Sequence, residues 1–290
     1  MKPIVIKPKS HKEWLKVRGQ GIGASEVAAV IGLSPWDSPY SLWLKKTGQL
    51  PPTEETFTMK LGHLLEPIVV QLWEESTGFK AVKSSAADII YQDPEKPWRK
   101  CTPDRIAHEM NYETGKKERT LIEIKTSSMN FEADDLPVYY LAQCQYQMLI
   151  TGIHRCTLAW LTNGRQFGFA PVEWDEEFAN FIGNEVDKFW NECVVGGKEP
   201  DLISVSDYAI KGSEPGTSVE ADSEAIFDIG ELRETNESIS SLEAKQEALK
   251  DKLKLFMGEK EVLTFGGQIL ATWKSGKKGR TFLLKKQKEQ

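Results

Sequence analysis

Hydrophobic positions in the first 80 residues repeat with the spacing of helices. The pattern predicts helices over residues 11–18, 26–31, 38–46 and 59–77. In the first of these, Trp14 and Val17 lie beside charged residues, as on the face of a short amphipathic helix. The second follows Ser25, a residue type that caps helix N-termini, and stops at Gly32. This part of the chain is therefore expected to be mainly helical.

Beyond residue 80 the apolar positions take the shorter period of strands. Runs separated by Pro, Asp and Gly predict three core strands, at 88–91, 101–108 and 120–125. The pattern continues with a helix, two strands and a second helix, over 137–150, 155–161, 166–172 and 175–193. Helices and strands in this order indicate an α/β domain built on one sheet, which we place over residues 1–200.

The last third of the chain has a different pattern. Gly, Ser, Pro and Asp are frequent up to residue 223, which indicates a linker over 201–223. The region 224–290 begins with a heptad repeat, which predicts a helix of about 25 residues that packs on a partner. Its a and d positions are Leu232, Thr235, Ile239, Leu242, Gln246, Leu249, Leu253 and Phe256. Apolar runs on both sides of Gly266-Gly267 then predict a hairpin.

The composition is that of a globular chain. Hydrophobic residues make up 40% of 290 positions, too many for a disordered acidic chain. No apolar run reaches the roughly 18 residues of a spanning helix, and the N-terminus lacks the apolar core of a signal peptide. We therefore expect a cytoplasmic protein with no membrane partner. The four cysteines form no CxxC pair, so neither a zinc ribbon nor an iron–sulfur cluster is expected.

Charge is distributed unevenly along the chain. The net charge of −6 argues at first against a nucleic-acid partner, because binding phosphates requires Lys and Arg. However, the segment from Lys274 to Gln290 carries seven basic residues and one acidic residue. The C-terminus is thus a basic tail on an acidic body, and such a tail is either a solvated charge run or a contact for DNA or a partner.

Two predicted strands carry the residue types of a metal-dependent phosphodiesterase. Thr102-Pro103-Asp104 lies in one, and Glu123-Ile124-Lys125 lies in the next. Glu123 and Lys125 point to the same face, because side chains alternate along a strand. Carboxylates from adjacent strands suit Mg²⁺, and a neighbouring lysine stabilises or deprotonates an attacking water. A Glu-x-Lys also occurs by chance on exposed strands, but here the flanking residues predict a buried one.

Four blocks together resemble one family. They are Trp14-x3-Arg18-Gly19-x-Gly21-Ile22-Gly23-Ala24-Ser25-Glu26-Val27, Gly62-His63-Leu64-Leu65-Glu66-Pro67, Thr102-Pro103-Asp104 with Glu123-Ile124-Lys125, and Tyr140-x2-Gln143-x-Gln145. In order and spacing, over roughly residues 10–195, the chain resembles the PD-(D/E)xK nucleases, and among them the YqaJ-type viral recombinases that include lambda exonuclease. The resemblance implies a restriction-endonuclease-like core, a central mixed sheet flanked by helices, extended here by the C-terminal helix and hairpin.

The resemblance also implies roles for individual residues. Asp104, Glu123 and the backbone carbonyl of Ile124 would hold the metal, Lys125 would be the catalytic lysine, and Glu66 a catalytic carboxylate near it. Arg18, Ser25 and Gln143 would bind the 5′ phosphate of a DNA end. An arginine fork and a hydroxyl at a helix N-terminus are suitable phosphate donors. Other interpretations remain: Glu66 as a plain polar position, Gln143 as a scaffold residue, and Arg18 paired with Glu13.

The implied activity is that of an exodeoxyribonuclease in phage-type recombination. It would use Mg²⁺, with two ions expected and Mn²⁺ as an alternative, to digest one strand of duplex DNA 5′ to 3′ and leave a 3′ overhang. Implied partners are double-stranded DNA ends, a single-strand annealing protein and further copies of the chain in a trimeric ring. A phage or prophage protein in a bacterial cytoplasm is implied.

Two other functions fit the same residues. One is a PD-(D/E)xK endonuclease that cuts DNA internally, and the other is a catalytically silent protein that binds DNA ends. Retention of Asp104, Glu123 and Lys125 together argues against the silent protein. Trp36 and Tyr40 are candidates for stacking on frayed bases, although packing in the core is the more usual role of such residues.

Overall fold

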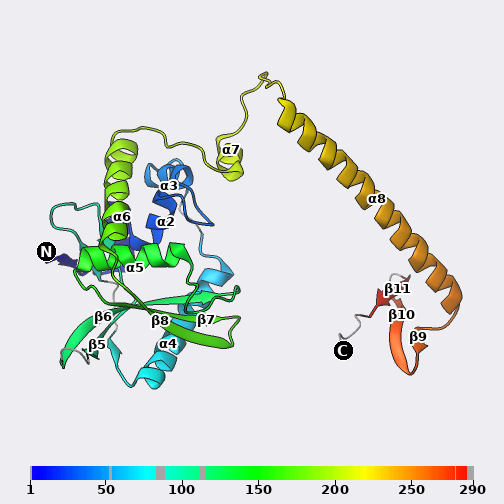
Figure 1. Cartoon of the computed structure of the whole chain (residues 1–290), viewed down its shortest axis with the longest axis horizontal. Helices are drawn as coiled ribbons and strands as arrows, with labels where there is room; N and C mark the ends of the chain where they lie inside the picture. The colour runs from blue at the N-terminus through cyan, green and yellow to red at the C-terminus, as the bar shows by residue number, and fades with distance from the viewer. Residues whose placement is uncertain (1, 52–53, 83–88, 112–114, 278, 286–290) are drawn as a thin grey trace. The chain divides into compact units, whose positions relative to one another are not determined.

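The chain folds into two compact units, Met1–Ser213 and Glu214–Gln290. The structure is a computed structural model and describes residues 2–51, 54–82, 89–111, 115–277 and 279–285. The first unit contains a five-stranded and a three-stranded sheet, and the second unit contains a three-stranded sheet (Figure 1). None of the helices in the described ranges combines the length and the apolar character that crossing a bilayer requires.

A five-stranded mixed sheet lies at the centre of the first unit. Its strands are β2 (Ala81–Val82), β5 (Arg105–Asn111), β6 (Lys116–Ser127), β7 (Cys156–Thr162) and β8 (Gln166–Val172). They lie in the order β2-β5-β6-β7-β8, with β6 and β7 parallel and the other neighbours antiparallel. Parallel strands need a crossover, which α5 (Val138–Thr151) supplies. The central mixed sheet flanked by helices is therefore confirmed.

Helices cover both faces of this sheet. On one face, Leu121 of β6 packs in an apolar cluster with Cys144 and Met148 of α5. On the other face, Ile122 and Ile124 pack against α4 (Phe57–Thr77). Figure 1 shows α5 and α4 on opposite sides of the sheet. Because the strand alternates, Glu123 and Lys125 share the α5 face with Leu121.

A second apolar cluster joins the N-terminal helices to α5 and the following helix. The helical segments that contribute to it, besides α5, are the 3₁₀ turn η1 (Ala24–Glu26), α2 (Val27–Val30), α3 (Pro39–Lys46), α6 (Glu176–Lys188) and the π-helical η2 (Phe189–Val195). The first helix, α1 (His11–Gly19), has no buried residue. A small antiparallel sheet lies beside them, in the order β1 (Ile4–Ile6), β3 (Ile90–Gln92), β4 (Lys100–Cys101). Helices are thus found in each of the four N-terminal regions expected.

The structure corrects the predicted strand over 101–108. The chain forms β4 in the small sheet, breaks at Thr102-Pro103-Asp104, and resumes as β5 in the central sheet. Proline has no amide hydrogen to donate to a ladder, which favours the break. The strand expected at 88–91 also belongs to the small sheet, as β3, and its Asp88 lies outside the described residues.

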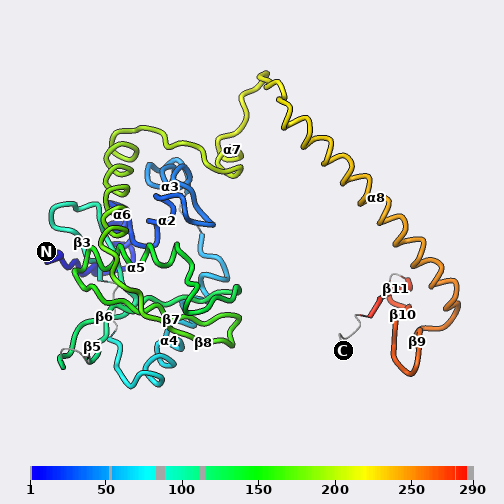
Figure 2. Tube along the Cα trace, viewed as in Figure 1, coloured from blue at the N-terminus to red at the C-terminus, as the bar shows by residue number. Residues whose placement is uncertain are grey.

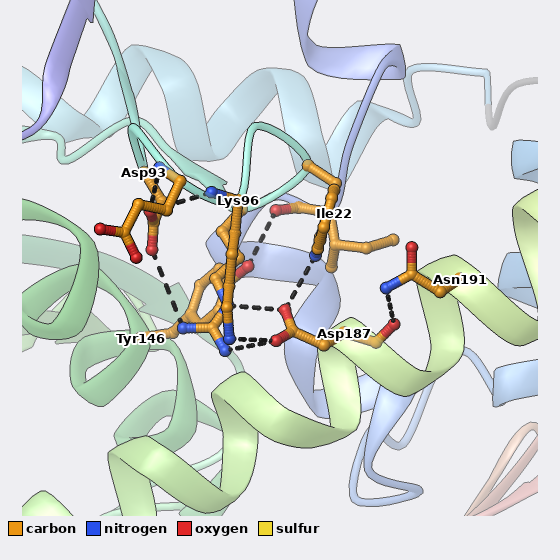
Figure 3. A network of polar contacts seen from close by, with 9 residues as sticks. Ile22, Asp93, Lys96, Tyr146, Asp187 and Asn191 are labelled. Atoms are coloured by element: carbon orange, nitrogen blue, oxygen red, sulfur yellow. Dashed lines mark hydrogen bonds and ion pairs between the residues drawn. The ribbon is translucent and has the colours of Figure 1, made fainter.

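Asp187 on α6 forms hydrogen bonds with the segment 96–99, which is distant in the sequence (Figure 3). Its carboxylate accepts hydrogen bonds from Arg99 Nε and Trp98 Nε1, both at 2.8 Å, and from Lys96 Nζ at 2.5 Å. The Trp98 carbonyl in turn accepts the Ile22 N–H at 2.7 Å. A Cβ at Gly21 would lie 2.2 Å from that carbonyl oxygen, so only glycine permits this approach. The glycine-rich segment is thereby fastened beside β4.

The segment predicted as a linker is partly folded, which corrects its start. It contains α7 (Val205–Lys211), capped by Ser204, and the first unit extends through residue 213. Asp207 is 1% exposed and accepts a hydrogen bond from the Ser38 hydroxyl at the start of α3. Although burial opposes ionisation, this bond and backbone N–H groups lower the Asp207 pKa. Composition alone does not reveal this tertiary contact.

The second unit contains a long helix and a three-stranded sheet (Figure 2). The helix α8 (Ser223–Met257) has 35 residues and is longer than the heptad repeat predicted. The hairpin expected after it is present as β9 (Val262–Phe265) and β10 (Gln268–Gly276). A third strand, β11 (Gly279–Leu284), pairs with β10 within the basic tail and was not expected.

Arg280 of β11 has a structural role in this sheet. Its guanidinium lies 3.7 Å from the Trp273 ring centroid and donates to the carbonyls of Gly258 and Lys260, each at 2.7 Å. These contacts hold Arg280 against β10 and the segment that follows α8. Lys278 and Lys286, two other basic residues of the tail, lie outside the described residues.

The Asp187 network predicts an acid-sensitive contribution to stability. Burial opposes ionisation, but hydrogen bonds from Arg99, Lys96 and Trp98 lower the Asp187 pKa. The folded pKa thus lies below the unfolded value, so the stabilisation is present above about pH 4 and is lost as pH falls through the folded pKa. We expect Asp187→Asn to lower the free energy of unfolding at pH 7 by about 2 kcal/mol, measured by urea denaturation.

Glu192→Gln is the matched control, because in the described part of the chain the Glu192 side chain forms a single ion pair, an exposed one with Lys198. Such pairs contribute little, and this change should leave the urea midpoint nearly unaltered. The difference in unfolding free energy between wild type and Asp187→Asn should narrow as pH falls through the folded pKa of Asp187. A difference that does not depend on pH would contradict the ionic origin of the effect.

Candidate active site

Glu123 is an almost completely buried carboxylate at the centre of the sheet. It is 2% exposed and lies on β6 opposite α5. Lys125 Nζ and Gln143 Nε2 each donate to its Oε1 at 2.5 Å, and Gln147 Nε2 donates to its Oε2 at 2.7 Å. A buried charge is costly unless it is paired and hydrogen-bonded, and this carboxylate is both.

The structure brings Asp104 to the same place. Asp104 lies just before β5, and its Oδ2 accepts the backbone N–H of Ile124 at 2.8 Å. Arg105 pairs with Ile122 in the ladder between β5 and β6, so Asp104 stands beside the segment that carries Glu123 and Lys125. The three residues of the Asp104, Glu123, Lys125 motif therefore converge from two neighbouring strands, as the sequence predicted.

Glu66 reaches this cluster through an arginine. Arg105 is 6% exposed and donates both to Glu66 Oε1 and, at 2.6 Å, to the Asp104 carbonyl. In the described part of the chain, no hydrogen bond joins Glu66 to Glu123 or Lys125. Glu66 is thus a helix carboxylate held next to Asp104 by Arg105, a residue that the sequence argument did not single out.

Charge repulsion is concentrated on Asp104. Burial raises the pKa of its carboxyl well above the ordinary value, and the negative charges of Glu123 and Glu66 add to the increase. Lys125 behaves in the opposite sense: burial opposes its charged form, but the carboxylates of Glu123 and Asp104 outweigh this and raise its pKa. Lys125 is therefore a cation here, whereas burial and the two neighbouring carboxylates oppose ionisation of Asp104.

The oxygen atoms gathered here suit a hard divalent cation. The available donors are oxygens of Asp104 and Glu123 with the Ile124 carbonyl, the type of ligand that Mg²⁺ prefers. Within the described ranges, no three His, Cys, Asp or Glu side chains converge as a metal site by themselves. An ion here would therefore rest on two carboxylates and a backbone carbonyl, and it would offset the repulsion that raises the Asp104 pKa.

Two glutamines one helical turn apart hold Glu123. Gln143 donates to Glu123 and accepts from Lys125 Nζ at 2.9 Å, so it bridges the two residues of the motif. Gln147 is fully buried, and its Oε1 has no hydrogen-bond partner among the described residues. Gln147 is not among the site residues predicted from the sequence. Its position four residues after Gln143, facing a strand with a buried glutamate, is the signal that points to it.

Arg18 and Ser25 form a separate polar pair. Arg18 Nη2 donates to Ser25 Oγ at 2.7 Å, and its guanidinium lies 4.9 Å from the Trp14 ring centroid. Among the described residues Arg18 forms no ion pair with Glu13, whose carboxylate accepts the backbone N–H of Lys9. Ser25 is exposed, but it lies inside η1 and does not cap it; Gly23 occupies that position.

The structure does not join all three residues expected to bind a phosphate. Arg18 and Ser25 meet, whereas Gln143 bonds to Glu123 and Lys125. No described hydrogen bond links the two groups. Tyr40 is 5% exposed in the N-terminal core, as packing predicts, whereas Trp36 is 68% exposed and meets Tyr139 edge-on.

Sequence comparison gives a consistent family. The YqaJ-like viral recombinase domain matches residues 13–154. The chain is also 30% identical over 278 residues to the uncharacterized protein YqaJ of Bacillus subtilis, covering 91% of this chain and 83% of that protein. This similarity is long enough to include most of the second unit.

Solved structures share the fold of this site. The chain is similar to the alkaline exonuclease LHK-Exo from Laribacter hongkongensis, with a TM-score of 0.50 and 23% identity, over 62% of this chain and 91% of that one. The complex of LHK-Exo with dAMP matches to the same extent. The restriction-endonuclease-like fold expected from the sequence is thereby confirmed.

We expect Gln147→Leu to destabilise the protein through Glu123. The change removes a hydrogen bond to a buried carboxylate, and such bonds contribute about 1.5–3 kcal/mol. In a Glu123→Gln background the charge is absent, so the same change should cost clearly less. Urea denaturation of wild type, both single variants and the double variant measures this coupling.

Met148→Leu is the control, a volume-conserving change at the next buried position of α5. It should cost less than about 1.5 kcal/mol and should show no coupling to Glu123→Gln. If the effects of Gln147→Leu and Glu123→Gln on the free energy of unfolding were strictly additive, Gln147 would have no role in holding the carboxylate.

Proposed function

Because this chain belongs to the YqaJ-like viral recombinase domain family, we propose that it is a metal-dependent exodeoxyribonuclease of phage-type homologous recombination. It digests one strand of duplex DNA from a 5′-phosphorylated end, in the 5′ to 3′ direction, and leaves a 3′ single strand. The observation that carries this proposal is the convergence of Asp104, Glu123 and Lys125 from two adjacent strands.

The proposed cofactor is Mg²⁺, as two ions, with Mn²⁺ as an alternative. Asp104, Glu123 and the carbonyl of Ile124 are the residues that would hold it. When bound, such an ion supplies Lewis-acid polarisation of the phosphate and an activated water. The support is the chemistry of the oxygen donors, together with the raised pKa of Asp104, which burial and the negative charges of Glu123 and Glu66 cause.

Other residues of the site orient the reacting groups and stabilise charge. Lys125 is held by Glu123 and Gln143, and its raised pKa keeps it positively charged. A fixed ammonium stabilises charge that develops on the phosphate during attack, and it needs no reorganisation because its partners already orient it. Glu66 and Arg105 set the position of the Asp104 backbone.

Arg18 and Ser25 are the proposed 5′-phosphate site. The Arg18 guanidinium retains further N–H donors, and the Ser25 hydroxyl is exposed beside it. This group is suited to a terminal phosphate, which an arginine fork binds with two hydrogen bonds. Gln143 was grouped with them by sequence, but its contacts favour a role in orienting Lys125 and Glu123. The dAMP bound in LHK-Exo is consistent with a site for nucleotides in this fold.

The proposed setting follows the family. The protein acts in the bacterial cytoplasm on double-stranded DNA ends, with a single-strand annealing protein as its partner, and it encircles DNA as a trimeric ring. A phage or prophage origin belongs to the same proposal. The length of similarity to YqaJ supports an activity that involves both units.

Lys125→Ala should abolish digestion of a linear duplex in Mg²⁺. The change removes the ammonium beside the reacting phosphate, so we expect the rate to fall by at least about 100-fold. Release of mononucleotides from a duplex labelled at one 5′ end measures it. Lys117→Ala, at an exposed position on the same strand, should digest normally. Cleavage of closed circles would indicate an endonuclease, and an inactive wild type would indicate an end-binding protein.

Arg18→Ala should remove the preference for 5′-phosphorylated ends. Charge-assisted hydrogen bonds contribute about 1.5–3 kcal/mol, so discrimination against 5′-hydroxyl ends should fall about 10- to 100-fold. Competition between the two kinds of end measures this ratio. Lys16→Ala, an exposed basic position on the same helix, should keep the preference. An unchanged ratio in Arg18→Ala would place the phosphate site elsewhere.

A further inference from the structure

The helix α8 carries an apolar seam that its own unit leaves uncovered. Of its 35 residues, only Met257 is buried. Leu232, Ile239 and Leu242 are 60%, 49% and 63% exposed. The seam consists of the a and d positions of one heptad frame, Leu232, Thr235, Ile239, Leu242, Gln246, Leu249, Leu253 and Phe256.

A helix of this kind is not expected to stand alone in water. At 1.5 Å per residue α8 is about 52 Å long, and helices gain most of their stability by packing an amphipathic face. Gly230, inside α8, lowers its intrinsic stability further. A heptad seam with a polar residue among its a positions is typical of coiled coils, in which that residue selects the register.

We propose that the seam of α8 packs against α8 of a second copy of this chain, in antiparallel orientation and with full overlap. Ile239 then lies opposite Leu242 of the partner subunit at the centre of the pair. Leu232 lies opposite Leu249 of the partner subunit. Thr235 lies opposite Gln246 of the partner subunit, so over the six central positions of the seam polar residues meet each other and apolar residues meet apolar ones. The last two positions, Leu253 and Phe256, lie opposite Asp228 of the partner subunit and Ala225 of the partner subunit.

The charge distribution along α8 favours this orientation. Acidic residues outnumber basic ones six to one over 223–243, whereas basic residues outnumber acidic ones four to two over 244–257. An antiparallel pair places the acidic half of one helix against the basic half of the other. A parallel pair would place like charges together along most of its length.

The residues that flank the seam select the same register. Glu231 and Lys252 occupy g positions, and the proposed overlap sets Glu231 opposite Lys252 of the partner subunit, twice per dimer. Neither residue forms an ion pair within the described chain. In a parallel pair, Lys245 would instead face Lys250 of the partner subunit. An antiparallel pair shifted by one heptad would place Glu243 opposite Glu243 of the partner subunit.

This interface is independent of the trimeric ring proposed for the family. It uses residues of the second unit alone, so the role of that unit would be to dimerise the chain. Any assembly made through the first unit would be joined to another through α8. The mass of the assembly that the full chain forms in solution should therefore fall when the seam is disrupted, whichever assembly the first unit makes.

Sedimentation of the full chain without DNA tests the seam. Ile239→Asp with Leu242→Asp places unpaired charges at the centre, and we expect association through α8 to weaken by more than about 100-fold. Ser240→Asp with Ser241→Asp adds the same charge outside the seam and should leave the mass unchanged. A wild type that stays monomeric up to about 100 µM, or equal masses for both double variants, would overturn the proposal.

Charge exchange tests the orientation without disturbing the core. Glu231→Lys and Lys252→Glu should each weaken association about 10-fold at low salt, and the double exchange should restore it. Within one helix these residues lie about 32 Å apart, so the rescue requires a second copy. Failure of the double exchange to restore association would rule out the antiparallel register. Tighter association in Lys250→Glu, which removes Lys245–Lys250 repulsion, would identify a parallel pair.

Discussion

A carboxylate held almost out of water on the central strand is the constraint around which the first unit is organised. Glu123 needs hydrogen-bond donors for both oxygens, and the strand supplies only Lys125. The other donors come from α5, where Gln143 and Gln147 stand one turn apart over β6. The crossover from β6 through α5 to β7 brings the helix back across this face. The site and the fold therefore depend on the same contact.

The opposite face shows why this arrangement is stable enough to hold a charge. Ile122 and Ile124 alternate with Glu123 and pack against α4 in an apolar cluster. The strand thus buries apolar side chains against α4 on one face, while Glu123 and Lys125 face α5 on the other. Removing water strengthens each of the interactions among Glu123, Lys125 and the glutamines. It also raises the pKa of Asp104, because burial disfavours its charged form and the neighbouring carboxylates repel it.

A second ionic network positions the groups that come from the N-terminus. Asp187 on α6 gathers Lys96, Trp98 and Arg99, and the Trp98 carbonyl holds Ile22. The segment between α1 and η1 is fixed in this way, and with it the Arg18–Ser25 pair. The second unit differs, because α8 buries only Met257 within its own unit. We propose that its apolar seam is buried against a second copy of the chain.

The sequence by itself determined the order of helices and strands, the mixed α/β core and the motif residues Asp104, Glu123 and Lys125. Periodicity and turn residues are local properties, and the strand alternation places Glu123 and Lys125 on one face without further information. Tertiary structure alone decided the division of 101–108 between two sheets, the anchoring of Asp207 on α3, and the roles of Gln147 and Arg105. These depend on contacts between residues far apart in the chain, which set whether a buried polar side chain finds its partner.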